Sequence, residues 1–140
     1  MQKRRILCID YGKKRIGLSI TNSIRSIAFG LDTVNSNNII CTLYKYLKYE
    51  DIDTIVIGLP IRFDNSLFPI EKDIKKFIKI INNKYPKLII KRIDERFTSK
   101  IANYYLINTR LKINQLKKNQ NFLDKDKISA TILLQEYIKY

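Results

Sequence analysis

The order in which strand-like and helical patterns follow one another along the 140 residues constrains the fold more than any other feature. Three short β-compatible runs, at residues 6–9, 16–21 and 27–34, come first with short connections between them, which predicts an antiparallel β-meander. Apolar residues then recur at helical spacing over 40–47, and a continuous apolar run at 54–58 is typical of a buried parallel strand. A helix followed by such a strand implies a crossover connection.

The rest of the chain continues this alternation. The further elements expected are a helix after Pro69 with an apolar face at Ile70, Ile74, Phe77, Ile78 and Ile81, a strand at 88–93, a short helix from Thr98 or Ser99 to Ile107, a loop or lid over 108–123, and a last helix capped by Asp124 and running to Tyr137. This order predicts an α/β fold in which a meander and parallel crossovers form one five-stranded mixed sheet with helices on both faces. At this length we expect one compact domain over 1–140.

The apolar segments are all short. None approaches the roughly 20 residues that a membrane helix needs, and the apolar run before Asp10 is too short for a signal peptide. We therefore expect a cytoplasmic protein without a membrane partner. Cys8 and Cys41 lie far apart, in a strand-like run and a helical pattern, and are interpreted as small core residues rather than a disulfide or a zinc site.

The chain contains no histidine. This excludes histidine-based triads, histidine general acids and histidine-ligated zinc, so that carboxylates, lysines, arginines or a metal must carry any chemistry. The net charge of +14 favours a polyanionic partner, above all nucleic acid. Codon bias toward lysine, isoleucine and asparagine would produce the same composition, so the charge alone does not decide between the two explanations.

Two carboxylates stand where predicted strands end. Asp10 follows the first strand and Glu95 the last one, and functional groups in parallel sheets gather at such ends. Asp126 begins a helical stripe that continues through Ala130 and Leu133 and so faces the sheet. Each has an ordinary alternative: Asp10 as a turn former, Glu95 as the ion-pair partner of Arg96, and Asp126 as a second helix cap.

Three converging carboxylates would repel one another unless a cation lay between them. Mg²⁺ or Mn²⁺ prefers oxygen ligands and removes this conflict, and such ions support phosphodiester hydrolysis without histidine. The basic turn Lys13-Lys14-Arg15 follows Asp10 and is a candidate phosphate contact, although a solvated hairpin tip would look the same. The glycines around it do not form a P-loop, because Leu18 stands where that motif requires lysine.

On these residues the sequence resembles the YqgF/RuvX family of pre-16S rRNA nucleases, which is related in fold to the RuvC Holliday-junction resolvases and to RNase H. The resemblance spans nearly the whole chain. It rests on Ile9-Asp10-Tyr11-Gly12 with Arg15-Ile16-Gly17, on Ile57-Gly58-Leu59-Pro60, on Asp94-Glu95-Arg96-Phe97-Thr98-Ser99, and on Asp126 with Ser129-Ala130 and Leu133-Leu134.

The resemblance implies an RNase H-like fold and metal-dependent cleavage that trims the 5′ end of the small-subunit ribosomal RNA precursor. The catalytic and metal-binding positions it implies are Asp10, Glu95 and Asp126, and the nucleic-acid contacts predicted around them are Lys13, Lys14, Arg15, Arg96 and Lys127. The sequence departs from the family pattern at three places. Asn65 replaces a glycine and is expected to tolerate a positive φ, Lys125 replaces an apolar residue, and 108–123 lacks glycine.

Structured RNA, the pre-16S rRNA in particular, is the favoured partner, and three alternatives remain open or are less favoured. A junction resolvase acting on branched DNA needs a symmetric dimer, and the sequence leaves the oligomeric state open. A non-catalytic RNA-binding module or ribosome assembly factor would share the basic charge. An actin-like phosphotransferase shares the Asp-x-Gly turn but needs two such domains, which 140 residues do not provide.

Overall fold

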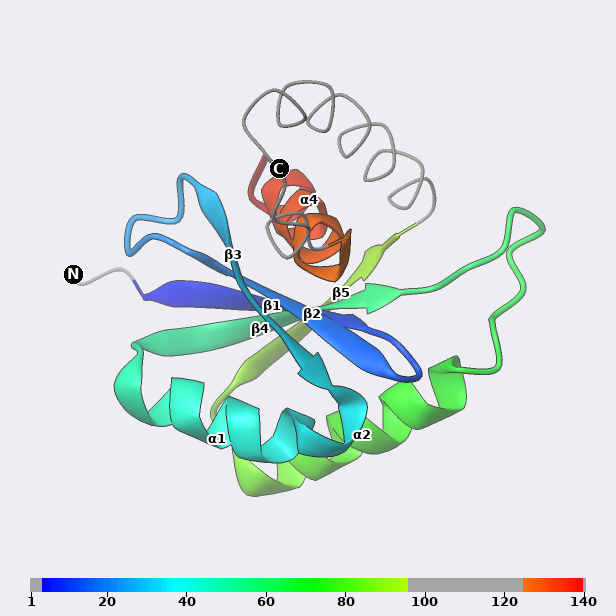
Figure 1. Ribbon diagram of the computed structural model, residues 1–140, viewed down its shortest axis with the longest axis horizontal. Coiled ribbons are helices and arrows are strands. Elements are labelled where there is room, and N and C mark those ends of the chain that lie inside the picture. The colour runs from blue at the N-terminus through cyan, green and yellow to red at the C-terminus, as the bar shows by residue number, and fades with distance from the viewer. Residues whose placement is uncertain (1–3, 96–124, 140) are drawn as a thin grey trace, which may run out of the picture.

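The computed structural model describes residues 4–95 and 125–139 as one five-stranded sheet with helices on both faces (Figure 1). The elements are β1 (Arg5–Tyr11), β2 (Arg15–Thr21), β3 (Ala28–Asn35), a 3₁₀ turn η1 (Ser36–Asn38), α1 (Ile39–Tyr49), β4 (Ile52–Leu59), α2 (Glu71–Lys84), β5 (Ile89–Asp94) and α4 (Lys125–Lys139). The helix expected from Thr98 or Ser99, the loop or lid at 108–123 and the cap at Asp124 lie outside the described residues.

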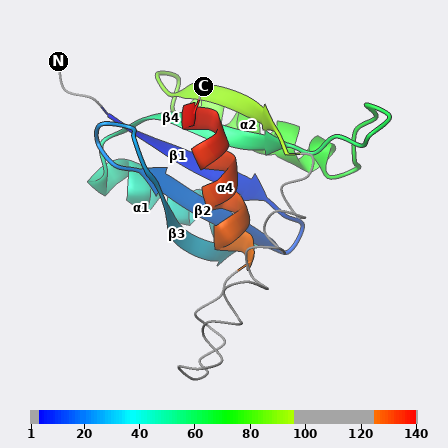
Figure 2. The same cartoon turned by 90° about the horizontal axis from the view of Figure 1, so that it is seen from above.

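The strand order is β3-β2-β1-β4-β5. β1, β2 and β3 pair antiparallel, whereas β4 runs parallel to β1 and β5 parallel to β4. Helices α1 and α2 cover one face of the sheet, and α4 lies across the other (Figures 1 and 2). The predicted mixed sheet, a meander joined to parallel crossovers and flanked by helices, is therefore confirmed.

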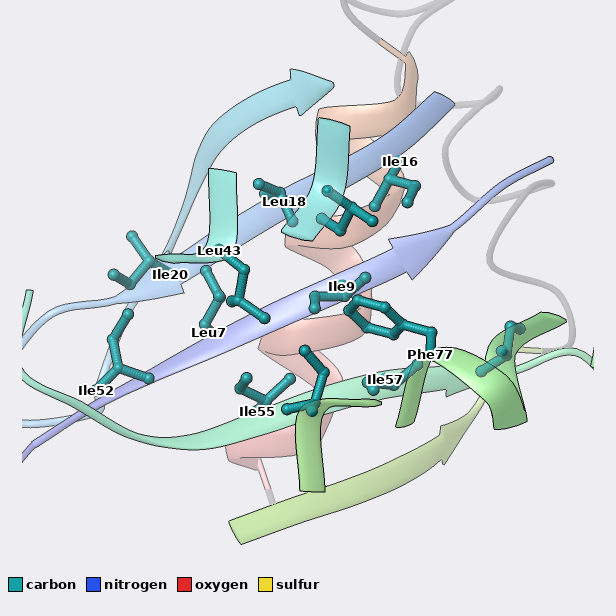
Figure 3. Close-up of a cluster of buried hydrophobic side chains, with 13 residues drawn as sticks. Leu7, Ile9, Ile16, Leu18, Ile20, Leu43, Ile52, Ile55, Ile57 and Phe77 are labelled. Atoms are coloured by element: carbon teal, nitrogen blue, oxygen red, sulfur yellow. The ribbon is translucent and has the colours of Figure 1, made fainter. Parts of the chain in front are cut away.

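Alternation along the strands divides the core into two clusters. In β1 the side chains of Leu7 and Ile9 point to α1 and α2, while those of Ile6 and Cys8 point to α4, as the period of two in a strand requires. Figure 3 shows the larger cluster, in which strand side chains pack against Leu43 and Phe77 of the helices. Asp10 continues the even-numbered side of β1, which faces α4.

Small residues bring α4 close to the sheet. Ser129 and Ala130 are buried in its first half, and Leu133 and Leu134 are buried one turn later. The Ser19 hydroxyl of β2 donates a hydrogen bond of 2.7 Å to the Ala130 carbonyl oxygen, which fixes the height of the helix over the sheet. The predicted sheet-facing stripe of this helix is confirmed at its apolar positions.

The buried residues of α1 are Ile39 and Leu43, and Ile40 and Leu47 of the expected helical repeat pack against the core, whereas Tyr44 is half exposed. One expectation about α1 is wrong. Cys41 is exposed and only Cys8 is buried in the core, because a residue midway between two buried positions four apart points away from the face they share. In the loop after β4, Asn65 has φ of +70°, as expected from its replacement of glycine.

No helix in residues 4–95 or 125–139 is long and apolar enough to cross a membrane.

Candidate active site

Asp10 lies on β1 between two glycines of the neighbouring strands. The antiparallel register places it opposite Gly17 of β2, and the parallel register, which pairs Ile9 with Ile57, brings Gly58 of β4 to its other side. All three positions are on the face of the sheet that α4 covers. A row of glycine, aspartate and glycine leaves open space on both sides of the Asp10 carboxylate.

Glu95 fills the space above Gly58. A Cβ atom added at Gly58 would overlap the Oε2 atom of Glu95 and would crowd Leu133 of α4. The backbone N–H of Glu95, just past the end of β5, donates to the Leu59 carbonyl oxygen at 3.3 Å, which ties this residue to the end of β4. The expected convergence of two strand-end carboxylates follows, because the Glu95 side chain contacts that of Asp10.

Asp126 lies above Gly17, on the other side of Asp10. A Cβ atom at Gly17 would overlap the backbone carbonyl of Asp126, so the first turn of α4 rests directly on β2. The Asp126 Oδ2 atom forms an ion pair with Arg15 Nε at 3.1 Å. Its charge is close enough to Asp10 to raise the pKa of that residue.

A hydrogen bond joins the carboxyl groups of Asp10 and Glu95. Burial raises the pKa of Asp10, a hydrogen bond from Glu95 lowers it in part, and Asp126 raises it again. Burial also raises the pKa of Glu95, which the charge of Asp10 and the hydrogen bond between the two raise further. Glu95 is therefore the proton donor and Asp10 the acceptor of the pair.

The donor set fits a hard divalent cation, because the three acidic side chains Asp10, Glu95 and Asp126 offer carboxylate oxygens. Two neighbouring carboxylates repel each other unless a proton lies between them. A bound cation would relieve the same repulsion in place of that proton. Within the residues that the structure describes, no three His, Cys, Asp or Glu side chains gather closely enough to hold a metal ion. Asp126 is turned to Arg15, while Asp10 and Glu95 form the closer pair.

Comparison with known proteins assigns this arrangement to a family. A family model with the description "RuvX: Holliday junction resolvase" matches residues 4–140. The chain belongs to the RuvX family. A relative from Karelsulcia muelleri is 99% identical over 97% of this chain and 99% of its own length, and one from Flavobacterium psychrophilum is 41% identical over 96% of each. Both carry the name "Putative pre-16S rRNA nuclease".

The RuvX assignment confirms several expectations from the sequence. The family has the RNase H-like fold and is a family of nucleases, and nucleases of that superfamily generally use divalent metal ions. Among solved structures, Pelota of Archaeoglobus fulgidus aligns with a TM-score of 0.45 and 11% identity over 99% of this chain and 37% of its own. That likeness is too low to carry an argument.

The basic turn after Asp10 is exposed at Lys13, Lys14 and Arg15. Ser36 braces it from the end of β3, because its hydroxyl donates to the Lys13 carbonyl oxygen at 2.8 Å and its N–H to that of Lys14 at 2.9 Å. Two lysines are thus presented beside the carboxyl pair on a fixed backbone, whereas Arg15 contacts Asp126.

The other two predicted nucleic-acid contacts are not at this turn. Lys127 is half-buried, and its aliphatic stem lies along Gly30 of β3, at 3.5 and 3.6 Å from where a Cβ atom of that glycine would be. Arg96 lies outside the described residues. The structure therefore brings together Asp10, Glu95, Asp126 and Arg15, with Lys127 beside them on α4.

Sequence reasoning missed a buried ion pair that supports Glu95. Arg92 of β5 contacts Glu71 of α2 through two hydrogen bonds of 2.6 and 2.9 Å, and also donates to the Gly58 carbonyl oxygen at 2.9 Å. The Arg92 charge lowers the pKa of Glu95. Little in the sequence indicates this pair, because Arg92 follows Lys91 in a strand that also holds Asp94.

Proposed function

We propose that this RuvX-family chain is a metal-dependent nuclease that processes the 5′ end of pre-16S ribosomal RNA. The observation that carries the proposal is the carboxyl pair of Asp10 and Glu95, half-buried between Gly17 and Gly58 and next to an exposed basic turn. Burying a pair of carboxyl groups is costly. Because glycines on both neighbouring strands leave room for this pair, a role in chemistry is favoured over a structural role.

Asp10 and Glu95 are the residues that would hold the ion, with Asp126 as a third ligand once it releases Arg15. A divalent cation held there would supply a Lewis acid for the phosphate and a means of activating water. Arg15, released from Asp126, would then be free to contact phosphate beside Lys13 and Lys14. The carboxylates on the sheet would thus bind the metal ion, and the basic residues of the turn would bind phosphate.

The choice of RNA rests on the curated relatives, which are named for pre-16S rRNA. A second candidate substrate is branched DNA, since the description of the family names a Holliday junction resolvase. The same carboxylates would serve either reaction, because both hydrolyse a phosphodiester. The substrate must therefore be decided by which nucleic acid is cut.

Cleavage of end-labelled precursor RNA, compared with a labelled four-way DNA junction, tests the proposal in Mg²⁺ and Mn²⁺. We expect the wild type to cut the RNA at a defined 5′ position and Asp10→Asn to lose this activity by at least a hundredfold, on the order expected for lost stabilisation of transition-state charge. Asp51→Asn is the matched control, because Asp51 forms an exposed ion pair with Arg4 at the other end of the sheet.

Three results would contradict parts of the proposal. Cleavage of the junction alone would make the chain a resolvase. RNA binding without cleavage would make it a non-catalytic assembly factor. Equal activity in Asp10→Asn and Asp51→Asn would remove the carboxyl pair from the chemistry.

A further inference from the structure

A second concave site lies at the end of the sheet opposite the carboxyl pair. It is a cavity of about 590 Å³ that opens between the C-terminal ends of α1 and α2, beside the first residues of β4. Because β1, β4 and β5 are parallel, their amino ends lie together here and their carboxyl ends at Asp10 and Glu95. The eight residues of β4, at about 3.3 Å each, separate the two sites by roughly 25 Å.

The wall of this cavity combines cations with aromatic rings. Lys48, Lys84 and Lys87 line it together with Tyr44 and Tyr85. The Lys84 ammonium lies 5.7 Å from the ring centroid of Tyr44 and 5.9 Å from that of Tyr85, which holds the charge between two aromatic faces. Tyr44 is 50% exposed, so a side of its ring is open to a ligand.

The charges of the cavity are unbalanced. Its one carboxylate, Asp53, is bound by Arg25, and Arg4 at the rim is paired with Asp51. In the described part of the chain no ion pair involves the three lysines. Their charges therefore remain available for an anion that enters the cavity.

Tyr85 adds an unsatisfied polar group to this wall. Its hydroxyl is buried, and among the described residues it has no hydrogen-bond partner. A buried polar group without a partner is costly. A ligand with both an aromatic face and anionic groups would use the exposed ring of Tyr44 and the lysines together, and its arrival would let the Tyr85 side chain shift to give its hydroxyl a partner.

We propose that this cavity binds a nucleotide of a single-stranded part of the substrate RNA, with its base on the Tyr44 ring and its phosphates at Lys48, Lys84 and Lys87. The proposal rests on the proposed function only in that the ligand is RNA. Aromatic rings stack on the open bases of single strands and cations track the backbone, whereas bases inside a duplex are closed to such stacking. The substrate would thus be held far from the cleavage point.

Binding of a short fluorescein-labelled single-stranded RNA tests this site in an Asp10→Asn background, in which cleavage does not interfere. We expect Tyr44→Ala to weaken binding at least fivefold, the lower end for a lost stacking contact, and Tyr44→Phe to restore it. Lys84→Gln should weaken binding severalfold more than Lys79→Gln. Lys79 is exposed on another face of the same helix, so this control removes the same charge outside the cavity.

The readout is independent of catalysis, so a failure here is distinct from a failure of the nuclease proposal. If Tyr44→Ala and Lys84→Gln bind RNA as tightly as Lys79→Gln, the cavity is not an RNA site, whether or not the wild type cleaves. Unaltered melting of each variant shows that the fold is intact. If adenosine monophosphate competes as strongly as the unlabelled RNA, the cavity is a mononucleotide pocket and the proposal is wrong. A Tyr44→Ala effect of equal size on duplex RNA would also contradict it.

Discussion

At the scale of single residues, Gly17 and Gly30 face the same helix with very different clearance. A Cβ atom at Gly17 would overlap the backbone of Asp126, whereas one at Gly30 would meet the Thr131 hydroxyl at 3.3 Å, a contact that a small side-chain movement relieves. We expect Gly17→Ala to lower the free energy of unfolding by about 1–3 kcal/mol, as overpacking does, and to reduce cleavage because Asp126 moves.

Gly30→Ala is the matched control and should change stability by less than about 0.5 kcal/mol. Urea denaturation of the two variants measures the difference. Equal stability of both would mean that the first turn of α4 yields freely, and the close fit of this helix to β2 would then have no energetic importance.

Asn65 is a residue whose backbone conformation can be tested separately from its contacts. Its φ of +70° is accessible to asparagine and glycine. For alanine and for β-branched residues this conformation raises the free energy of the folded state by about 1 kcal/mol or more. Asn65→Gly and Asn65→Ala both remove the side chain beyond Cβ, so we expect Asn65→Ala to be less stable than Asn65→Gly by about 1 kcal/mol. Thermal melting of both variants decides this, and identical melting temperatures would contradict it.

At the scale of elements, Arg92 and Glu71 join β5 to α2 next to the carboxyl pair. The Glu71 side chain is only 5% exposed, so Arg92→Met would leave a buried carboxylate without its partner. We expect this variant to lose about 3 kcal/mol of stability and much of its activity, because the pKa of Glu95 rises further. Arg4→Met, which breaks the exposed pair with Asp51, should lose less than about 1 kcal/mol.

A double-mutant cycle separates the pair from its surroundings. Glu71→Gln combined with Arg92→Met should recover part of the stability, since no buried charge is then left unpaired. Strictly additive losses in denaturant melts would show that the two side chains act independently.

The elements also show what the sequence could predict. The strands were predictable because their apolar patterns can be read from short stretches of sequence. The same holds for the sheet-facing side of α4, whose stripe runs from Ala130 through Leu133. The meeting of Asp10 and Glu95 followed from strand direction alone. In α1 the repeat at Leu43 and Leu47 was predicted correctly, but Cys41 was not, because an apolar side chain within a helical pattern does not by itself show which face it lies on.

Contacts between distant elements had no such local signal. Arg92 and Glu71 are 21 residues apart, and no sequence pattern in either segment indicates that the two side chains pair. Gly17 and Gly58 were recognised as parts of family motifs, but their role depends on Asp126 and Glu95 lying above them. The space above these two glycines is created by the assembled sheet and helix, and it cannot be predicted from one strand alone.

At the scale of the whole molecule, the net charge of +14 predicts nucleic-acid binding that weakens with salt. Each phosphate contact on a single strand contributes a slope of about −0.7 to log K against log salt concentration. We expect Lys13→Ala and Lys14→Ala each to reduce the slope by about that amount, with little change in sequence preference. Fluorescence anisotropy over a salt series measures this, and a slope near zero in the wild type would attribute the charge to codon bias.

The raised pKa values of the carboxyl pair make stability depend on pH. The pKa of Asp10 is raised from 3.8 to about 6 and that of Glu95 from 4.5 to about 8, mainly by burial. Between these ordinary and raised values the folded state binds more protons than the unfolded state. Stability therefore falls as pH rises, by about 1.4 kcal/mol per pH unit for each extra proton.

Without divalent ions, the free energy of unfolding should decline up to about pH 8, with the steepest part between about pH 5 and pH 6, where both carboxyl groups hold an extra proton in the folded state. Because the chain has no histidine, only the terminal amine ordinarily titrates there, so the decline reports the pair. Glu95→Gln carries no charge to bury and should flatten the profile and be more stable than the wild type at pH 8. Mg²⁺ should recover the lost stability of the wild type at pH 8, since a cation takes the place of the proton, and should do so less in Glu95→Gln. Urea melts in EDTA and in Mg²⁺ measure all four conditions. A flat wild-type profile in EDTA would mean that Asp10 and Glu95 are both ionised without a cation, which would contradict the raised pKa values of the pair.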